Sequence, residues 1–380
     1  MKRSSERILT THTGSLPRPE DLAAMLYARE RQEAVDEAKF QSRVREAVAA
    51  VVKQQIECGI DVVNDGEAGK VGYSTYVIER LSGFGGQGSV PPLGDLVDFP
   101  DYAKRLLGEA ALAEMKAPAC TGPVTWKDRD AVLVEIENFR AASQNAGAQD
   151  LFLSAASPGV ISLFLKNQHY PSHEKYLAVL ADVMKEEYEA IADAGFVLQL
   201  DCPDLAMGRH IQFADASLAE FRRMAAMHVE ALNHAVANIP PDRMRIHLCW
   251  GNYEGPHHRD VPLRDIIDVI LKARPAGLSF EAANPRHEHE WTVFQEVKLP
   301  DGKVLIPGML DSCSNYIEHP ELIAQRLVRL AEIVGRENVL AGTDCGFATF
   351  AGFLTVEPNI TWAKFRALAE GAKLASQRLW

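Results

Sequence analysis

The chain has 380 residues, of which 47% are hydrophobic, so it is long enough to bury a large core. Its formal net charge of −12 argues against a nucleic-acid-binding protein, because no surplus of Lys and Arg is available to neutralise phosphates. The chain has no run of about eighteen apolar residues and no apolar stretch of the signal-peptide type near its start. We therefore expect a cytoplasmic protein without membrane spans; oligomerisation is left open.

Short apolar runs of the β type alternate with longer amphipathic stretches along the chain. The predicted strands are residues 8–13, 61–65, 117–125, 151–156, 197–201, 244–250, 277–281, 304–310 and 339–343. Helical patterns occupy the intervals, for example residues 174–194, 217–238 and 320–334. This alternation predicts parallel strands with crossover helices. We expect a single-domain (β/α)₈ TIM barrel over residues 1–380, with an open doubly wound sheet as the alternative. Nine predicted strands for eight positions mean that one of them is peripheral or is not a strand.

Two segments interrupt the alternation and are expected to be insertions. Residues 83–101 are rich in Gly and Pro, which suits a lid or substrate loop. Residues 18–45 begin with a Pro-rich turn and then become helical.

Reactive side chains gather where the predicted strands end, at the face where barrel enzymes place their chemistry. They are His12, Ser15, Asp65, Glu67, Asp201, His247, Cys249, Glu281 and Cys345.

Four of these residues form a candidate metal site. His247 and Cys249 are two positions apart on a strand, so both side chains point to one side. Glu281 and Cys345 end later strands, and the four together offer one nitrogen, two sulfur and one oxygen donor. This set suits Zn²⁺ and suits Mg²⁺ or Ca²⁺ poorly. The alternatives are that the cysteines only pack as small apolar residues, or that His257–His258 or His287 and His289 form the site instead.

A zinc ion with two thiolate ligands is electron-rich and holds a further thiolate well, keeping it ionised and nucleophilic near neutral pH. Glu281, as the weakest of the four predicted ligands, could yield its place to an incoming sulfur.

Nearly the whole chain resembles the cobalamin-independent methionine synthase family, specifically its C-terminal catalytic barrel. The motifs that carry the resemblance are TTHTGSLPRP at 10–19, DVVNDGE at 61–67, LQLDCPDLA at 198–206, IHLCW at 246–250, LSFEAAN at 278–284 and GTDCGF at 342–347. The resemblance implies a (β/α)₈ barrel and zinc on His247, Cys249, Glu281 and Cys345. It further implies that Ser15, Glu67 and Asp201 hold the amino-acid part of homocysteine.

The chain departs from the family mainly in the residues that would bind the methyl donor and assist its reaction. The full-length enzyme of the family has a second, N-terminal barrel, which we do not expect here because this chain is about half that size. Asp311 matches a family aspartate, but Cys313 stands where the family has a histidine that assists methyl transfer. No Trp occurs in residues 154–171, where the family stacks its folate. Asp311 and Cys313 are the candidate catalytic residues, and a polyglutamylated folate donor is in doubt.

We therefore expect a zinc-dependent thiol alkyltransferase that moves a methyl group to homocysteine or a similar small thiol. The alkyl donor is left open among a methyl-folate, a methylated corrinoid and an epoxide. The epoxide alternative resembles epoxyalkane:coenzyme M transferase, whose sulfonate-bearing thiol would need a cation such as Arg286. A metal-free barrel of the uroporphyrinogen decarboxylase type and a non-enzymatic zinc store are the rival classes; the first has no use for the ligand set.

Overall fold

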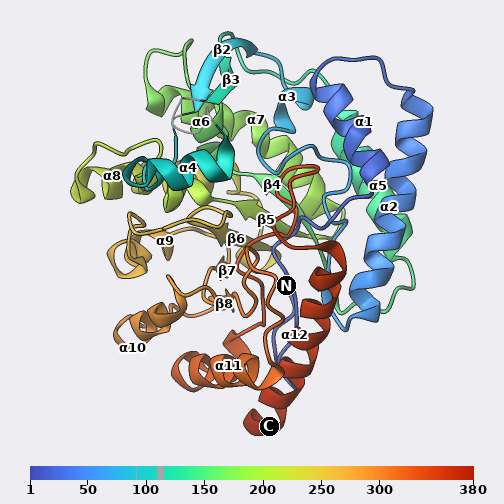
Figure 1. Ribbon diagram of the computed structural model, residues 1–380, viewed down its shortest axis with the longest axis vertical. Coiled ribbons are helices and arrows are strands. Elements are labelled where there is room, and N and C mark those ends of the chain that lie inside the picture. The colour runs from blue at the N-terminus through green and yellow to red at the C-terminus, as the bar shows by residue number, and fades with distance from the viewer. Residues whose placement is uncertain (91, 109–114) are drawn as a thin grey trace.

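The structure is a computed structural model that describes residues 1–90, 92–108 and 115–380. Its centre is a curled parallel sheet with the strand order β1-β4-β5-β6-β7-β8, which helices surround (Figure 1). The strands are β1 (Val62–Val63), β4 (Asp150–Ala156), β5 (Val197–Asp201), β6 (Met244–Leu248), β7 (Gly277–Phe280) and β8 (Val304–Pro307). Each pairs with its neighbour in parallel, so the carboxyl ends of all six lie at one edge of the sheet.

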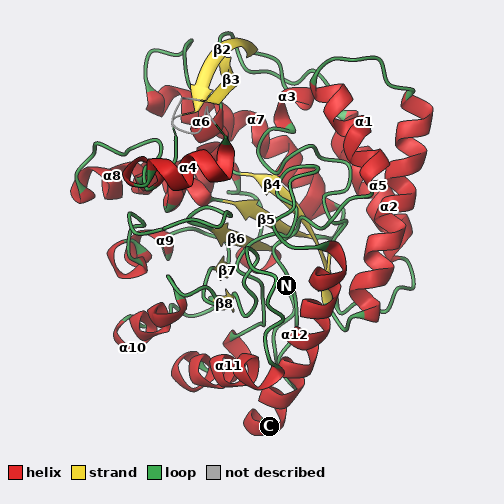
Figure 2. Ribbon diagram, in the orientation of Figure 1, coloured by secondary structure: helices red, strands yellow, loops and turns green. Residues whose placement is uncertain are grey.

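The helices lie outside this sheet (Figure 2). They are α1 (Glu20–Glu30), α2 (Glu37–Glu57), α3 (Val77–Arg80), α4 (Pro100–Leu107), α5 (Asp130–Ser143), α6 (Pro158–Phe164), α7 (His173–Asp193), α8 (Leu218–Ala235), α9 (Ile267–Ile270), α10 (Val293–Glu296), α11 (Pro320–Val334) and α12 (Pro358–Leu379). Local sequence explains their starts. The Ser172 side chain accepts the Lys175 N–H at the start of α7, and Ser217 with Glu220 forms a capping box at α8.

The segments 8–13 and 339–343, both predicted as strands, lie between β8 and β1. Isolated bridges join them to each other and to β8, and backbone hydrogen bonds join segment 8–13 to β1. Residue Ala341 bridges to Thr10, and Val339 bridges to Leu305 of β8. The carbonyl oxygen of Thr10 also accepts hydrogen bonds from the N–H groups of Asp61 and Val62, at 3.1 and 3.0 Å. These contacts connect the two edges of the six-stranded sheet.

Apolar side chains from both segments and from the sheet pack into one interior cluster. Its buried members are Leu9, Val62, Phe152, Val197, Val304, Ile306 and Leu340. Burial of these side chains stabilises the curled arrangement, since each residue contributes roughly 1.5–3 kcal/mol when fully removed from water.

The predicted strand at 117–125 is not a member of the parallel sheet. The structure places β3 (Met115–Cys120) antiparallel to β2 (Phe84–Val90) in a separate two-stranded sheet. Pro118 explains the difference, because proline lacks the N–H that a central strand must donate and is tolerated at an edge. Strand β2 also occupies part of the Gly-rich segment 83–101 that was predicted as a loop; residue 91 of that segment lies outside the described residues.

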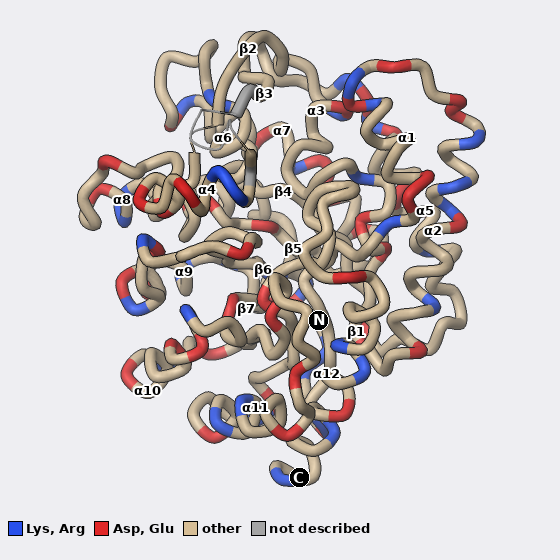
Figure 3. Tube along the Cα trace, viewed as in Figure 1, with Lys and Arg blue, Asp and Glu red and all other residues tan. Residues whose placement is uncertain are grey.

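Lys and Arg are interspersed with Asp and Glu over the outer helices (Figure 3). None of the helices in the described part of the chain combines the length and the hydropathy that a membrane span requires.

Candidate functional site

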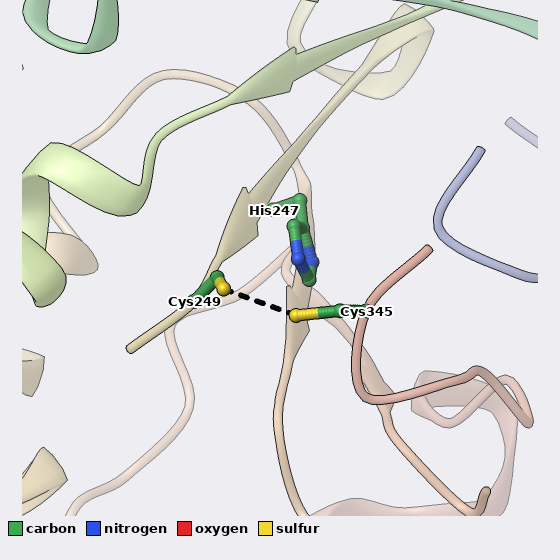
Figure 4. A group of neighbouring side chains, drawn as sticks. All are labelled: His247, Cys249 and Cys345. Carbon is green, nitrogen blue, oxygen red and sulfur yellow. Dashed lines mark hydrogen bonds between the residues drawn. The ribbon is translucent and has the colours of Figure 1, made fainter. Parts of the chain in front are cut away.

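Three of the four predicted metal ligands lie together at the carboxyl edge of the sheet (Figure 4). Strand β6 carries His247, and Cys249 follows two residues later on the same side, while Cys345 comes from the segment after 339–343. One ligand atom from each side chain lies within 4.8 Å of the other two, and all three residues are buried. The sulfur atoms of Cys249 and Cys345 are 3.0 Å apart. The structure thus assembles one imidazole and two thiols into a compact donor group.

The surroundings hold the imidazole in the form that binds metal. Burial lowers the pKa of His247 to about 3, so the ring is neutral at physiological pH. One of its ring nitrogens, Nδ1, lies 3.1 Å from the hydroxyl of Ser279 on β7. Such a partner fixes the orientation of a ligand histidine and leaves the second nitrogen for the metal.

The two thiols are neutral without a cation beside them. The hydrogen bond from Cys345 lowers the pKa of Cys249, but burial and the charge of Glu281 outweigh it and leave the pKa at about 11. Burial likewise raises the pKa of Cys345 well above its ordinary value. A divalent cation would reverse these shifts, since it favours the thiolate form of its ligands.

Glu281 lies beside the donor group and is already hydrogen-bonded. Its Oε1 atom is 3.7 Å from the sulfur of Cys345 and accepts the Trp250 N–H at 2.8 Å. Its Oε2 atom accepts the side-chain amide of Asn284 at 2.8 Å. The fourth predicted ligand therefore sits next to the compact group rather than within it.

Asp344 is a supporting residue to which the sequence analysis gave no role. Its carboxylate accepts the backbone N–H groups of Ala282, Ala283 and Asn284 at 2.7–2.8 Å. The loop after β7, which carries Glu281, is thereby tied to the segment that carries Cys345. The only signal in the sequence was its place directly before Cys345 in the GTDCGF motif.

A cavity of about 260 Å³ opens beside the donor group and is lined by all three predicted thiol-binding residues, Ser15, Glu67 and Asp201. His247, Cys249 and Cys345 line the same cavity. The register of the sheet explains part of this arrangement, because Asp201 at the end of β5 pairs directly with His247 on β6. Three of the predicted metal ligands and the predicted thiol-binding residues therefore line one cavity, which we call the thiol chamber.

The two carboxyl groups in this chamber, those of Glu67 and Asp201, are buried, and one oxygen of Glu67 has no hydrogen-bond partner. Glu67 has a left-handed backbone (φ 54°), which is strained for a residue other than glycine, and its Oε2 atom is buried without a hydrogen-bond partner. Burial raises the pKa of Glu67, and it raises the pKa of Asp201 well above its ordinary value. A cationic ligand group would supply the missing partner.

Asp311 and Cys313 line a different cavity, of about 600 Å³, together with Glu281 and Arg286. The Cys313 N–H donates to the Asp311 carboxylate at 2.8 Å, and the Cys313 sulfur lies 3.1 Å from the side-chain oxygen of Asn252. Asn252 lines both cavities. The structure does not bring the predicted catalytic pair into the chamber that holds the thiol-binding residues.

Three of the four histidines that were the alternative metal ligands, His257, His258 and His287, are paired with carboxylates. His257 and His287 both contact the Asp260 carboxylate, at 2.9 and 3.0 Å, and His287 also contacts Glu290 at 2.8 Å. His258 pairs with a carboxylate near the surface. Within residues 1–90, 92–108 and 115–380, His247, Cys249 and Cys345 form the only group whose ligand atoms are close enough to share a metal ion.

Fold and site together define an α/β protein with a buried His/Cys/Cys donor group that opens into a small-molecule chamber at the carboxyl ends of parallel strands. Residues 8–100 and 164–359 match the family described as cobalamin-independent synthase, catalytic domain. The chain belongs to this family, which confirms the resemblance seen in its motifs.

Curated relatives agree with this assignment, and a solved structure shares the fold. The methionine synthase of Sulfolobus acidocaldarius is 26% identical over 357 residues, covering 93% of this chain and 90% of the relative. That of Thermococcus kodakarensis is 23% identical and covers 97% and 94%. Among solved structures, a B12-independent methionine synthase from Shewanella sp. W3-18-1, in complex with selenomethionine, superposes with a TM-score of 0.76 at 19% identity, covering 98% of this chain and 99% of that one. This last similarity establishes the shared fold.

Proposed function

We propose that this protein is a zinc-dependent methyltransferase that transfers a methyl group to the thiol of homocysteine or of a closely similar amino acid. One observation carries the proposal. The His247, Cys249 and Cys345 donor group lies in the wall of the same chamber as Ser15, Glu67 and Asp201. The names of the archaeal relatives, methionine synthase, support the same activity.

The donor group fits zinc. One neutral imidazole and two thiols, all buried and mutually within 4.8 Å, form a soft ligand set that Zn²⁺ prefers over oxygen-seeking cations. Zinc at this position supplies a positive charge that lowers the pKa of a substrate thiol toward neutrality. Glu281, 3.7 Å from the Cys345 sulfur, is our proposed fourth and displaceable ligand.

The chain's own residues bind and orient the amino-acid part of the thiol. The unpartnered Oε2 of Glu67 and the carboxyl group of Asp201 would receive an ammonium group, and the hydroxyl of Ser15 would donate to a carboxylate. Holding both ends of the amino acid against the chamber wall directs its sulfur toward Cys249 and Cys345. This positioning removes much of the entropic cost of the reaction.

The rival thiol, coenzyme M, and the rival decarboxylase both need cations around an anionic ligand. No Lys or Arg lines the thiol chamber in the described part of the chain. Arg286 lines the second cavity instead, where its guanidinium lies 3.4 Å from the carbonyl oxygen of His258. The charges therefore favour a thiol that carries an ammonium group.

We extend the proposal to architecture and to the second cavity. Segments 8–13 and 339–343 would complete an eight-stranded (β/α)₈ barrel, and residues 1–380 would form one domain. The bridge from Val339 to β8 and the hydrogen bonds from Asp61 and Val62 to Thr10 support this closure. Asp311 and Cys313 remain predicted catalytic residues. Asn252 contacts the Cys313 sulfur and lines both cavities, so it would connect this pair to the thiol chamber.

The test is to measure zinc by mass spectrometry on untagged protein purified under reducing conditions, then to follow metal–sulfur coordination on adding homocysteine. About one zinc per chain, a homocysteine-dependent change in coordination and formation of methionine from a methyl donor would support the proposal. Protein that holds no zinc and takes up none would contradict it.

A further inference from the structure

The thiol chamber has an aromatic end that the amino-acid part of homocysteine does not need. Tyr73, Phe164 and Phe350 line it, and their ring centroids lie 5.6–6.4 Å from one another in tilted and edge-to-face arrangements. Phe353, with 47% of its surface exposed, and several aliphatic side chains extend this wall toward the outside. The polar residues that would bind the amino acid share the cavity with this wall.

The chamber is lined by two acidic residues and by no Lys or Arg in the described part of the chain. These are Glu67 and Asp201, and both are nearly fully buried. The cations near Glu67 do not line the chamber and have other partners. Lys70 pairs with Glu135 at 2.7 Å, and Arg18 donates to backbone carbonyl oxygens of Glu67 and Ala348. Because this lining holds no Lys or Arg among the described residues, a cationic ligand would meet no like charge from either residue type there.

We propose that the aromatic end binds an onium methyl donor, a sulfonium or a quaternary ammonium compound, with its cationic methyl groups against Tyr73, Phe164 and Phe350. This inference rests on the proposed function, which supplies the thiolate acceptor. Faces of aromatic rings attract alkylated cations, and this attraction is stronger where the cation is removed from water. The same surroundings disfavour the poly-anionic tail of a folate donor, because no Lys or Arg lines the chamber in the described residues.

The chemistry of such a donor balances without further reactants. The thiolate sulfur attacks the methyl carbon, the new carbon–sulfur bond forms, and the bond from that carbon to the onium sulfur or nitrogen breaks. Its electron pair stays on the leaving atom, so the leaving group is a neutral thioether or amine and needs no proton. This agrees with the position of Cys313, which stands in place of the family histidine and lines the other cavity.

A binding experiment tests the site independently of turnover. Choline and its uncharged isostere 3,3-dimethylbutan-1-ol differ only in the charge of the central atom, and both can be titrated into the full chain by calorimetry or ligand-observed NMR. We expect choline to bind at least about fivefold more tightly, as a desolvated cation–π contact implies. The variant Phe350→Leu keeps an apolar side chain and should lose most of this preference. Phe99→Leu, at an exposed ring outside the chamber, is the matched control.

A second ring variant, Phe164→Leu, should lose the preference for choline in the same way. The thermal unfolding transition of both variants is measured as well, and a transition like that of the parent shows that the lost preference reflects the ring rather than misfolding. Equal affinity for choline and its isostere in the parent protein would overturn the inference. So would an unchanged preference in both ring variants.

A turnover experiment separates this inference from the proposed function. Zinc-loaded protein with homocysteine is given S-methylmethionine, glycine betaine, methyl-folate, methylcobalamin or anisole, each with a deuterated methyl group, and labelled methionine is measured. Label from an onium donor at a rate at least tenfold above the others supports the inference. Label from methyl-folate, methylcobalamin or anisole with onium donors inert overturns the inference and leaves the proposed function standing. Failure of zinc or homocysteine to bind overturns the proposed function itself.

Discussion

The sulfur atoms of Cys249 and Cys345 lie 3.0 Å apart although 96 positions separate the two residues in the chain. Cys249 follows β6, and Cys345 follows the segment that bridges β8 to the N-terminal residues. The contact therefore joins two segments that are distant in the chain at the carboxyl edge of the curled sheet. Metal binding at this pair would stabilise the folded chain, because the unfolded chain does not hold the two thiols together.

The first prediction concerns Cys345. Replacing it with alanine should lower zinc affinity more than about 100-fold, since a lost ligand costs more than the 10–100-fold typical of lost supporting contacts. Competition with a chromogenic chelator measures the affinity. The control is Cys58→Ala, which removes a buried free cysteine that lies outside the donor group. Equal zinc affinity in the two variants would contradict the predicted ligand role.

The second prediction concerns Ser279, whose hydroxyl lies 3.1 Å from Nδ1 of His247. Ser279→Ala should reduce zinc affinity by about 10–100-fold, because the imidazole loses the partner that fixes its ring. Thr at this position should restore much of the affinity, since it keeps a hydroxyl group. If the alanine variant binds zinc like the parent, the hydroxyl does not position the ligand.

Parts of this site were predictable from local pattern. A strand has a side-chain period of two, so the spacing of His247 and Cys249 alone implied that both face one way. The place of Cys345 after a predicted strand implied the same face of the sheet. The aromatic wall was not predictable, because Tyr73, Phe164 and Phe350 come from three loops or helix ends whose meeting is set by tertiary packing.

Two further features could not be predicted from the sequence, namely the place of the strand at 117–125 and the cavity that Cys313 lines. A short apolar run does not distinguish an antiparallel edge strand from a parallel central one, and β3 proved to be the former. The side of a loop that a residue faces is likewise not a local property. Cys313 accordingly lines the second cavity, although its neighbours in sequence matched the family's catalytic segment.

The third prediction separates binding of the ammonium group from the reaction. Glu67→Gln should raise KM for homocysteine about 10–100-fold, which is the loss expected of one charge-assisted hydrogen bond, with a smaller effect on kcat. The desamino analogue 4-mercaptobutyrate lacks the ammonium group, so the variant should use it as well as the parent does. An equal loss with both thiols would show that Glu67 acts on the fold rather than on the ammonium group.

The fourth prediction concerns Gly346, the glycine of the D-C-G motif. A Cβ atom on Gly346 would lie 2.0 Å from the hydroxyl oxygen of Ser15, far inside contact distance. Gly346→Ala should therefore displace Ser15 and raise KM for homocysteine, while the zinc content stays at the parent value. The variant Gly122→Ala serves as a control, since its added Cβ would meet only the Gly83 Cα at 3.7 Å, an ordinary van der Waals contact. Unchanged KM in Gly346→Ala would rule out a tight contact at Ser15.

The fifth prediction concerns pH and Asp65, whose pKa is raised to about 7 mainly by burial and further by Glu135. The folded state then holds a proton that the unfolded state releases above its ordinary pKa near 4, so stability falls as pH rises toward 7 and is constant above it. Between pH 5 and pH 7 the parent should lose roughly 2–3 kcal/mol from this group, at 1.36 kcal/mol per pH unit. Asp65→Asn keeps an oxygen to accept the Glu67 N–H, which Asp65 receives at 3.0 Å, but cannot titrate. Urea unfolding at pH 5, 6, 7 and 8 should give a flatter profile for the variant, and parallel profiles would show that Asp65 is ionised in the folded protein across this range.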